Sequence, residues 1–296
     1  MIGIAIILVN YKGYKDTLEC IKSIKESSFT NYKIIVVENA SGEKELFCKD
    51  TFINQNSTVL FAKHNDGFST GNNIGIRYAL EQFNPEYVLL LNNDTVIRKD
   101  TLEELYSRAQ KLKDLGILTG KIYNYFNKNL LWAAQGKFNC KTGLADQPLM
   151  GKLDTIDANQ FSKISFASGC LMLIPSHILK TVGLLDQSFF MYAEDTDYCC
   201  RVMNAGFEIY YEPKAVIYHK VSASTGHNSI SQQYYMFRNN CYIAKKYCVK
   251  PWYGYLRRIY RSVKDVIKGE LKLRVILKAW IDFRKGITGK VEKYTI

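Results

Sequence analysis

The chain has 296 residues, of which 47% are hydrophobic and 23% charged, so it can form one large α/β domain with a full core and an appendage. This composition excludes a mainly disordered chain, and no apolar run reaches the roughly 18 residues that a membrane-spanning helix needs. The net charge is +12, but residues 250–296 hold thirteen Lys and Arg against four Asp and Glu, a net of +9, which leaves +3 for the first 249 residues. A basic tail on a nearly neutral body indicates contact with a polyanion, either anionic lipid or nucleic acid.

The N-terminal segment Ile2–Val9 is apolar but has no basic leader and no cleavage site, so it is predicted as a strand rather than a signal peptide. The eight cysteines form no C-x-x-C pair and have no zinc-finger spacing. We therefore expect reduced thiols, as in a cytosolic protein.

Strand and helix patterns alternate through the first third of the chain. Apolar runs predict buried strands, and 3.6-residue periodicity predicts helices between them. The predicted strands are Ile4–Val9, Tyr32–Val37, Val59–Phe61 and Tyr87–Leu91, and the predicted helices are Thr17–Lys25 and Asn73–Phe83. This alternation implies βαβ units and a mostly parallel, Rossmann-like sheet flanked by helices.

The middle of the chain is less regular. Residues 124–164 are polar and mixed, as expected for excursions around a site. A helix is predicted at Glu194–Ala205, and strands are predicted at Gly116–Tyr123, Ser165–Ile174, Glu208–Tyr211 and Val216–Tyr218.

Two basic amphipathic segments follow within residues 249–296. The apolar residues of the first recur on one helical face and are Trp252, Leu256, Ile259, Tyr260, Val263 and Ile267; the segment from Leu273 to Ile287 repeats the pattern. Tryptophan beside a cationic face is typical of interfacial helices, so we expect contact with an anionic membrane surface. Packing on the body of the chain, or on another subunit as in a homodimer, is the alternative. The stripes are too regular for a nucleic-acid arm and no RNA-binding signature occurs, so no nucleic-acid partner is expected.

Polar residues follow each of the four predicted strands in the first third. They are Asn10 and Tyr11, then Glu38 and Asn39, then Asn65 and Gly67, then Asn92, Asn93 and Asp94. Because the carboxyl ends of parallel strands share one edge, where open α/β folds bind ligands, these clusters are expected to converge on one crevice.

Asp94 and His219 are candidate metal ligands. Asp94 follows a buried strand, from where its carboxylate can ligate Mg²⁺ or Mn²⁺ together with substrate phosphates; an Asx turn or helix cap is the alternative. His219 ends an apolar strand and precedes a Ser- and Gly-containing segment. A neutral imidazole can complete a metal shell with Asp94, and a hydrogen-bonded buried histidine is the alternative.

Three acids, Glu194, Asp195 and Asp197, open the predicted helix at residue 194. Ordinary capping, with Asp197 paired to Arg201, is one interpretation. One cap needs only one acid, however, and the aromatic segment Phe189–Tyr192 before them could limit water access and favour a catalytic base.

The segment Gly67–Gly75 is a candidate for cradling phosphate. Its glycines lie at intervals of four, which does not match G-x-G-x-x-G, and Gly116–Lys121 is one residue short of a Walker sequence. These departures disfavour NAD-dependent dehydrogenases and P-loop NTPases.

Seven motifs combine into a larger pattern that covers about residues 3–240. In chain order they are Ile7-Leu8-Val9-Asn10-Tyr11, Val36-Val37-Glu38-Asn39-Ala40-Ser41, Asn65-Asp66-Gly67-Phe68 with Gly71-Asn72-Asn73, Leu90-Leu91-Asn92-Asn93-Asp94, Ala167-Ser168-Gly169-Cys170, Glu194-Asp195-Thr196-Asp197, and His219 with Ser224-Thr225-Gly226. Their order and spacing resemble those of the family 2 glycosyltransferases, especially the bacterial rhamnosyltransferase-like branch of polysaccharide and cell-wall glycan synthesis.

The resemblance implies a glycosyltransferase A-type fold and inversion by a single displacement. It makes Asp195 the general base with Glu194 beside it, and Asp94 the last acid of the metal motif, with His219 completing the shell for Mg²⁺ or Mn²⁺. The residues implied to bind the nucleotide-sugar donor are Asn10, Tyr11, Glu38, Asn39, Asn65, Gly67, Asn73, Asn92 and Asn93. Two positions depart from the family pattern: the metal motif holds fewer carboxylates than Asp-x-Asp, and Glu38 stands where many members have Asp.

These observations predict a nucleotide-sugar-binding catalytic domain over residues 1–248, and a helical extension over residues 249–296 that contacts a membrane. The expected activity is hexosyl transfer from dTDP-L-rhamnose, or otherwise a UDP-hexose, to a glycan or lipid-linked saccharide. The expected location is cytoplasmic, peripheral at the inner face of the membrane. The alternative is a non-catalytic membrane-surface adaptor or binding protein that uses the basic tail.

Overall fold

The structure is a computed structural model that describes residues 2–220 and 229–294. Its strands are β1 (Ile4–Asn10), β2 (Tyr32–Glu38), β3 (Thr58–Phe61), β4 (Tyr87–Leu91), β5 (Thr95–Ile97), β6 (Leu115–Asn124), β7 (Leu131–Ala133), β8 (Lys137–Asn139), β9 (Leu144–Asp146), β10 (Ser162–Ile164), β11 (Leu171–Pro175) and β12 (Glu208–His219). Ten of them form one sheet with the order β10–β12–β6–β11–β4–β1–β2–β3, in which β5 joins β12 and β7 joins β6. Strands β8 and β9 form a separate hairpin.

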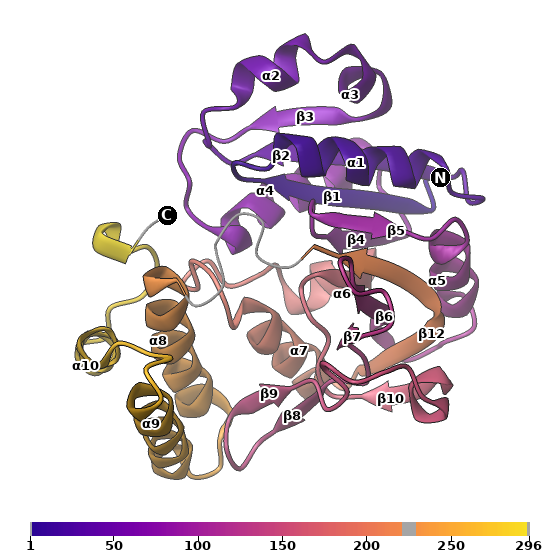
Figure 1. The fold of residues 1–296 in the computed structure, drawn as a ribbon. Helices are drawn as coiled ribbons and strands as arrows, with labels where there is room; N and C mark the ends of the chain where they lie inside the picture. The colour runs from indigo at the N-terminus through magenta and orange to yellow at the C-terminus, as the bar shows by residue number, and fades with distance from the viewer. Residues whose placement is uncertain (1, 221–228, 295–296) are drawn as a thin grey trace.

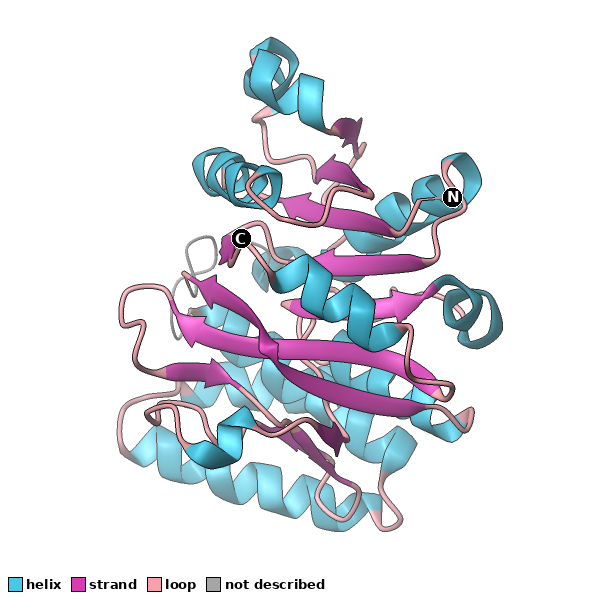
Figure 2. Ribbon diagram, turned by 90° about the vertical axis from the view of Figure 1, so that its right-hand side faces the viewer, coloured by secondary structure: helices cyan, strands magenta, loops and turns pink. Residues whose placement is uncertain are grey.

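The helices cover both faces of this twisted sheet, except for the C-terminal ones, which lie beside it (Figures 1 and 2). They are α1 (Tyr14–Lys25), α2 (Lys44–Lys49), α3 (Thr51–Asn56), α4 (Phe68–Gln82), α5 (Thr101–Ala109), α6 (Ser176–Val182), α7 (Glu194–Asn204), α8 (Ile230–Tyr247), α9 (Pro251–Ile267) and α10 (Leu273–Arg284), with 3₁₀ turns at Ile156–Asn159 and Glu292–Tyr294. Alternate residues of β1 enter two different core clusters, because successive side chains of a strand point to opposite faces. The sheet is therefore buried on both sides.

The sheet is parallel where the sequence predicts it. Strand β1 pairs in parallel with β2 and β4, and β2 pairs in parallel with β3. Strand β11 is antiparallel to both β4 and β6, and β12 is parallel to β6. The predicted α/β class is confirmed, and the sheet is mixed in its second half.

Two strand predictions need correction. Residues 208–219 form one strand, and its register against β6 shifts between Glu212 and Val216. Pro213 lies at this shift, where a residue without a backbone N–H interrupts the ladder. The strand predicted at Ser165–Ile174 begins only at Leu171, because Ser165 and Phe166 donate their backbone N–H groups to the carbonyl of Gly136 instead.

The C-terminal helices form a lobe beside the sheet, at the lower left of Figure 1. Helix α8, which the sequence patterns do not predict, lies between α7 and the pair α9–α10. A core cluster of its own joins α8 and α10 to the loop around Phe190. No helix among the described residues is both long and apolar enough to cross a membrane.

Candidate active site

The ends of β1, β2 and β4 meet at one edge of the sheet and share a hydrogen-bond network. Asn10 lies opposite Glu38 in the β1–β2 ladder, and its carbonyl accepts from the backbone N–H of Asn39 at 2.9 Å. The side-chain Oδ1 of Asn10 accepts from Thr17 Oγ1 at 2.9 Å, and Asn93 Nδ2 donates to the same hydroxyl at 2.8 Å. The polar clusters at these strand ends therefore converge, as parallel topology requires.

The loop after β3 joins the same network. Asn39 Nδ2 donates to Asn65 Oδ1 at 3.1 Å and to the carbonyl of Gly67 at 3.3 Å, while Asn39 Oδ1 is buried without a hydrogen-bond partner among the described residues. Glu38 is also buried, and its carboxylate accepts from the backbone N–H of Ser41 at 2.6 Å. Tyr11 is partly exposed. This edge leaves Asn39 with a buried acceptor that a ligand could use.

The segment from Gly67 to Gly75 is not the glycine-rich loop that a phosphate cradle requires. Helix α4 begins at Phe68, and its glycines lie against β1: an added Cβ would be 2.8 Å from Val9 at Gly71 and 2.5 Å from Ile7 at Gly75. Four-residue spacing therefore reflects one helical face in close packing.

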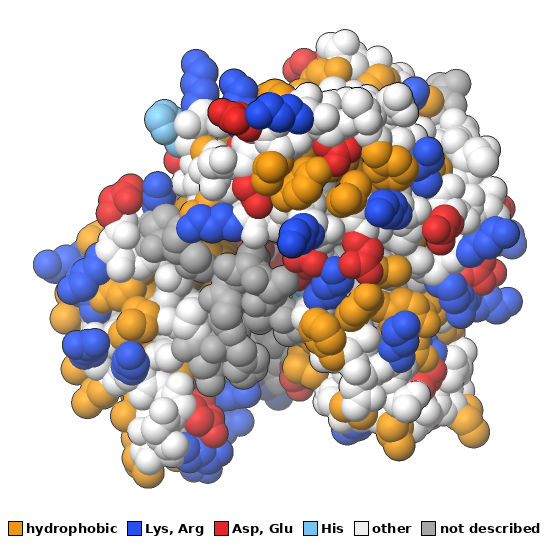
Figure 3. All heavy atoms as spheres, turned by 45° about the horizontal axis from the view of Figure 1, so that its top comes forward, with side chains coloured by type: hydrophobic (Ala, Val, Ile, Leu, Met, Phe, Trp, Pro, Cys, Tyr) orange, Lys and Arg blue, Asp and Glu red, His pale blue; other side chains and the backbone are white. Residues whose placement is uncertain are grey.

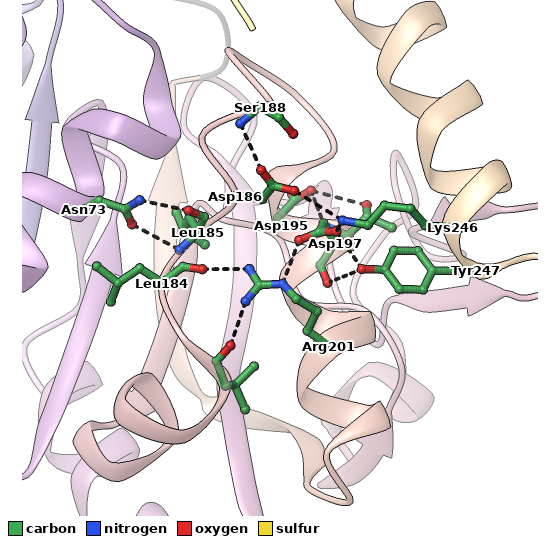
Figure 4. A network of polar contacts seen from close by, with 12 residues as sticks. Asn73, Leu184, Leu185, Asp186, Ser188, Asp195, Asp197, Arg201, Lys246 and Tyr247 are labelled. Atoms are coloured by element: carbon green, nitrogen blue, oxygen red, sulfur yellow. Dashed lines mark hydrogen bonds and ion pairs between the residues drawn. The ribbon is translucent and has the colours of Figure 1, made fainter. Parts of the chain in front are cut away.

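Gly67 and Asn73 hold the loop that precedes α7. Gly67 has a φ of 97°, and a Cβ there would lie 2.0 Å from the carbonyl oxygen of Phe190. Asn73 exchanges two hydrogen bonds with the backbone of Leu185, at 2.8 and 3.1 Å (Figure 4). Because both amide atoms are occupied, Asn73 positions this loop.

Asp94 and His219 lie together at the ends of β4 and β12. His219 Nε2 is 3.2 Å from Asp94 Oδ1 and 3.5 Å from Asn92 Nδ2. Two neighbouring ligands about 2.1 Å from an octahedral ion lie about 3.0 Å apart, so this spacing suits one divalent cation. No group of three His, Cys, Asp or Glu side chains in the described part of the chain could hold a metal by itself. The pair fits Mg²⁺ or Mn²⁺ only if substrate oxygens supply further ligands.

In the absence of a cation, the surroundings of His219 favour a protonated imidazole, and a metal ion would have to displace that proton to bind the ring. Burial lowers the pKa of its imidazole, but Cys170 and Asp94 outweigh burial and raise that pKa to about 10. His219 Nδ1 and Asn92 Oδ1 are buried without hydrogen-bond partners among the described residues. The Ser224-Thr225-Gly226 motif that follows His219 lies outside the described residues.

The three acids at the start of α7 have different environments. Asp195 is partly exposed, and its carboxylate accepts from the backbone N–H groups of Thr196 at 2.7 Å and Gly169 at 3.2 Å. Glu194 is buried, with Oε2 lacking a partner among the described residues. Asp195 is thus the acid that a substrate could reach.

Asp197 is the structural member of the three. It is fully buried and accepts from Arg201 Nε at 2.8 Å, from Lys246 Nζ at 2.6 Å and from Tyr247 Oη at 2.6 Å (Figure 4). The predicted Asp197–Arg201 pair is confirmed. It gives Asp197 a structural role but does not account for Glu194 and Asp195.

Burial raises the pKa of both remaining acids. For Asp195 it outweighs the hydrogen bonds from Gly169 and Thr196, which lower the pKa. For Glu194 burial and the neighbouring charge of Asp195 raise the pKa well above its usual range. Both carboxyl groups therefore hold a proton more readily than an exposed acid does.

A short segment connects the acid to the candidate metal pair. Gly169 donates to Asp195, and the carbonyl of the next residue, Cys170, accepts from the backbone N–H of Asn92 at 3.0 Å. Cys170 also interacts with the His219 imidazole. The two halves of the site are therefore one residue apart along this segment.

Several residues that the sequence patterns do not indicate belong to the same region. Glu43 accepts from Asn10 Nδ2 at 2.9 Å, and Trp132 lies edge-on to the His219 ring with centroids 4.4 Å apart. Asn239 of α8 donates to the carbonyls of Met191 and Tyr192, both at 2.9 Å. None of these residues follows a predicted strand or opens a predicted helix, which were the signals that identified the others.

Comparison with known proteins decides the family. The model of the family described as "Glycosyltransferase like family 2" matches residues 3–236. The chain belongs to glycosyltransferase family 2. It is 28% identical over 285 residues to the low-salt glycan biosynthesis hexosyltransferase Agl10 of Haloferax volcanii, covering 95% of this chain and 87% of that protein.

Two further relatives are named for rhamnosyl transfer. The chain is 26% identical to the rhamnosyltransferase WbbL of Escherichia coli, over 70% of this chain and 80% of that protein. It is 24% identical to the dTDP-rhamnosyl transferase RfbF of Shigella flexneri, over 96% of both chains. These relatives support a glycosyltransferase enzyme, so the non-catalytic adaptor is set aside.

Solved structures confirm the fold. GalNAc-T7, crystallised with UDP, GalNAc and Mn²⁺, superimposes with a TM-score of 0.64 at 12% identity over 83% of this chain and 48% of that one. S. aureus TarS 1–349 superimposes with a TM-score of 0.58 at 15% identity, over 96% and 81%. The predicted glycosyltransferase A-type fold is therefore correct.

Proposed function

We propose that this family 2 glycosyltransferase inverts the configuration of the sugar that it transfers, with Asp195 as the general base. The observation that carries the proposal is the segment Gly169–Cys170, in which one residue contacts Asp195 and the next contacts His219. It sets a partly exposed carboxylate of raised pKa beside the Asp94–His219 pair. A base on one side of a sugar and a cation-supported diphosphate on the other are what a single displacement requires.

In the proposed step, the acceptor hydroxyl gives its proton to Asp195 while its oxygen forms a bond to the anomeric carbon. The bond from that carbon to the diphosphate breaks at the same time, and the nucleoside diphosphate leaves with the electron pair. The carboxylate also favours the positive charge that develops on the sugar ring. Bound to Asp94 and His219, Mg²⁺ or Mn²⁺ would offset the charge of the departing diphosphate.

The donor is proposed to be dTDP-L-rhamnose, with a UDP-hexose as the alternative. Two relatives are named for rhamnosyl transfer and a third for hexosyl transfer. The nucleotide would lie along Asn10, Tyr11, Glu38 and Asn39, where Asn39 Oδ1 offers its unused acceptor. The proposed acceptor is a glycan or a lipid-linked saccharide, and a lipid-linked acceptor would place the enzyme at the cytoplasmic face of a membrane.

The test is to incubate the full chain with dTDP-L-rhamnose or UDP-hexoses, with Mg²⁺ or Mn²⁺, and to measure nucleoside diphosphate release. Calorimetry with dTDP and UDP gives nucleotide preference, and NMR of a transferred product gives its anomeric configuration. We expect dTDP preference and inversion. A clear preference for UDP would rule out the rhamnose assignment alone, whereas a product of retained configuration would rule out the single displacement.

A further inference from the structure

Helix α9 turns its apolar stripe away from the protein. Trp252, Leu256, Tyr260, Val263 and Ile267 are between 47% and 80% exposed. At about 100° of rotation per residue, they fall within an arc of roughly 60 to 80° on one side of the helix. Ile259 is the member of the predicted stripe that packs against the protein instead.

The opposite side of α9 makes the contact with the rest of the chain, and it does so through small residues. Gly254 and Ser262 are the buried positions, and a Cβ at Gly254 would lie 2.9 Å from the side chain of Ala244 in α8. Packing of the stripe on the body of the chain is therefore contradicted for α9. None of its five exposed stripe residues packs in a core cluster of the described residues.

Helix α10 is apolar on two sides. Val275, Ile276, Ala279 and Phe283 are buried in the cluster around α8. Leu273, Leu277 and Ile281 recur every four residues on another face and are 47–53% exposed. This outward face of α10 is therefore apolar and exposed, like the stripe of α9.

The exposed hydrophobic side chains are concentrated in the C-terminal helices rather than spread evenly along the chain. Among the described residues, eleven of the twenty exposed large hydrophobic side chains lie between positions 249 and 287. Single exposed apolar residues are ordinary, but a contiguous group marks an interaction surface.

Basic side chains border the apolar ones. The exposed cations of the two helices and of the residue that follows each are Arg257, Arg261, Lys264, Lys268, Arg274, Arg284 and Lys285. None of the seven forms an ion pair with an acid in the described part of the chain, unlike Lys278 and Lys290, which pair with Asp282 and Glu292. Figure 3 shows hydrophobic and basic side chains side by side over the lobe at its left.

We propose that the outward faces of α9 and α10 together form a docking surface for an anionic membrane. Apolar side chains entering the interfacial region and cations meeting lipid phosphates stabilise the same orientation. A second copy of the chain suits this surface less well, because it would bring the same seven unpaired cations against these ones. The association is reversible, because it depends on surface burial and screened charge.

The test is co-sedimentation of the full chain with vesicles of phosphatidylcholine, with and without phosphatidylglycerol. We expect binding to the anionic vesicles that falls as salt rises. The triple variant Leu256→Ser, Val263→Ser and Leu277→Ser should lower the partition coefficient at least tenfold. Because these side chains are exposed, the melting temperature should stay close to that of wild type.

The matched control is Phe126→Ser, Leu153→Ser and Ile156→Ser, which removes hydrophobic side chains that are at least as exposed and lie far from the tail in sequence. It should bind as wild type does. Equal binding by both triple variants, or no binding of wild type to anionic vesicles, would overturn the proposal. So would a wild-type dimer in sedimentation equilibrium that only the α9–α10 variant dissociates, since the face would then join two copies of the chain.

Discussion

The carboxylate of Asp195 is held in a defined direction while remaining open to a ligand. Backbone N–H groups of Thr196 and Gly169 fix its two oxygens, and Glu194 beside it is buried with no partner among the described residues for one oxygen. Burial raises the pKa of both acids, and the neighbouring charge of Asp195 raises the pKa of Glu194 further. The two adjacent acids therefore differ in role through their environment.

Asp195→Asn should lower kcat by two or more orders of magnitude, because the amide keeps the shape of the side chain but cannot take up the acceptor's proton. Donor affinity, measured by calorimetry, should change little. Asp146→Asn, which alters an exposed carboxylate of the β8–β9 hairpin, is the control. Turnover of Asp195→Asn within a few-fold of wild type would remove Asp195 from the role of base.

The pH profile gives a second readout of the same group. A base works only when deprotonated, so activity should be lost as the pH falls through the pKa of Asp195. Because burial raises that pKa, the acidic limb of kcat/KM should lie above the ordinary aspartate value of 3.8. Steady-state rates across acidic and neutral pH would show it, and a limb at or below 3.8 would contradict a raised pKa.

At the scale of elements, α8 connects the C-terminal lobe to the loop that precedes α7 and its acids. Tyr192 and Ala193 both have positive φ, at 67° and 73°, a conformation that costs non-glycine residues free energy. Asn239 holds the carbonyl of Tyr192 in this strained pair, together with that of Met191. The guanidinium of Arg238 donates to the carbonyl of Gly289. The backbone N–H of Gly289 in turn donates to the carbonyl of Ser188, in the loop before α7, at 2.6 Å.

Asn239→Ala should lower kcat by about tenfold to a hundredfold with a smaller change in KM for the donor, since a displaced base affects the chemical step more than donor binding. The matched control is Asn240→Ala, because Asn240 is partly exposed and its side chain bonds within α8, to Met236. Steady-state kinetics of both variants decides the matter. Equal losses in kcat for the two, or a loss confined to KM, would contradict a positioning role.

Elements with simple periodicity could be predicted from the sequence, and others could not. Strand β4 has the predicted bounds, because a continuous apolar run has one stable arrangement in a buried parallel sheet. Helix α4 begins five residues before the predicted Asn73, since its first turn holds Gly71, which is unfavourable in an isolated helix and acceptable here through close packing on β1. Tertiary contact decided that boundary.

At the scale of the whole molecule, the sequence could indicate residues that follow strands, because topology alone brings strand ends together. It could not indicate Asn239 or Trp132, whose places depend on how α8 packs against the loop before α7 and on how β7 pairs with β6. Nor could periodicity show which side of α9 faces outward. Small residues, Gly254 and Ser262, decided that orientation by allowing close approach to α8.

The nucleotide edge and the Asp94–His219 pair lie in one connected network, so nucleotide and cation should bind cooperatively. The pair offers a cation one carboxylate and one imidazole, and a diphosphate would complete its shell. We expect the melting temperature to rise more with dTDP and Mn²⁺ together than the sum of the two separate rises. At a hundredfold excess over Kd the joint stabilisation is about 2.7 kcal/mol, a shift of several degrees.

Asp94→Ala should abolish the excess, whereas Asp146→Ala should preserve it. Additive shifts in the wild-type chain, or an unchanged excess in Asp94→Ala, would show that the cation does not bind between Asp94 and the diphosphate.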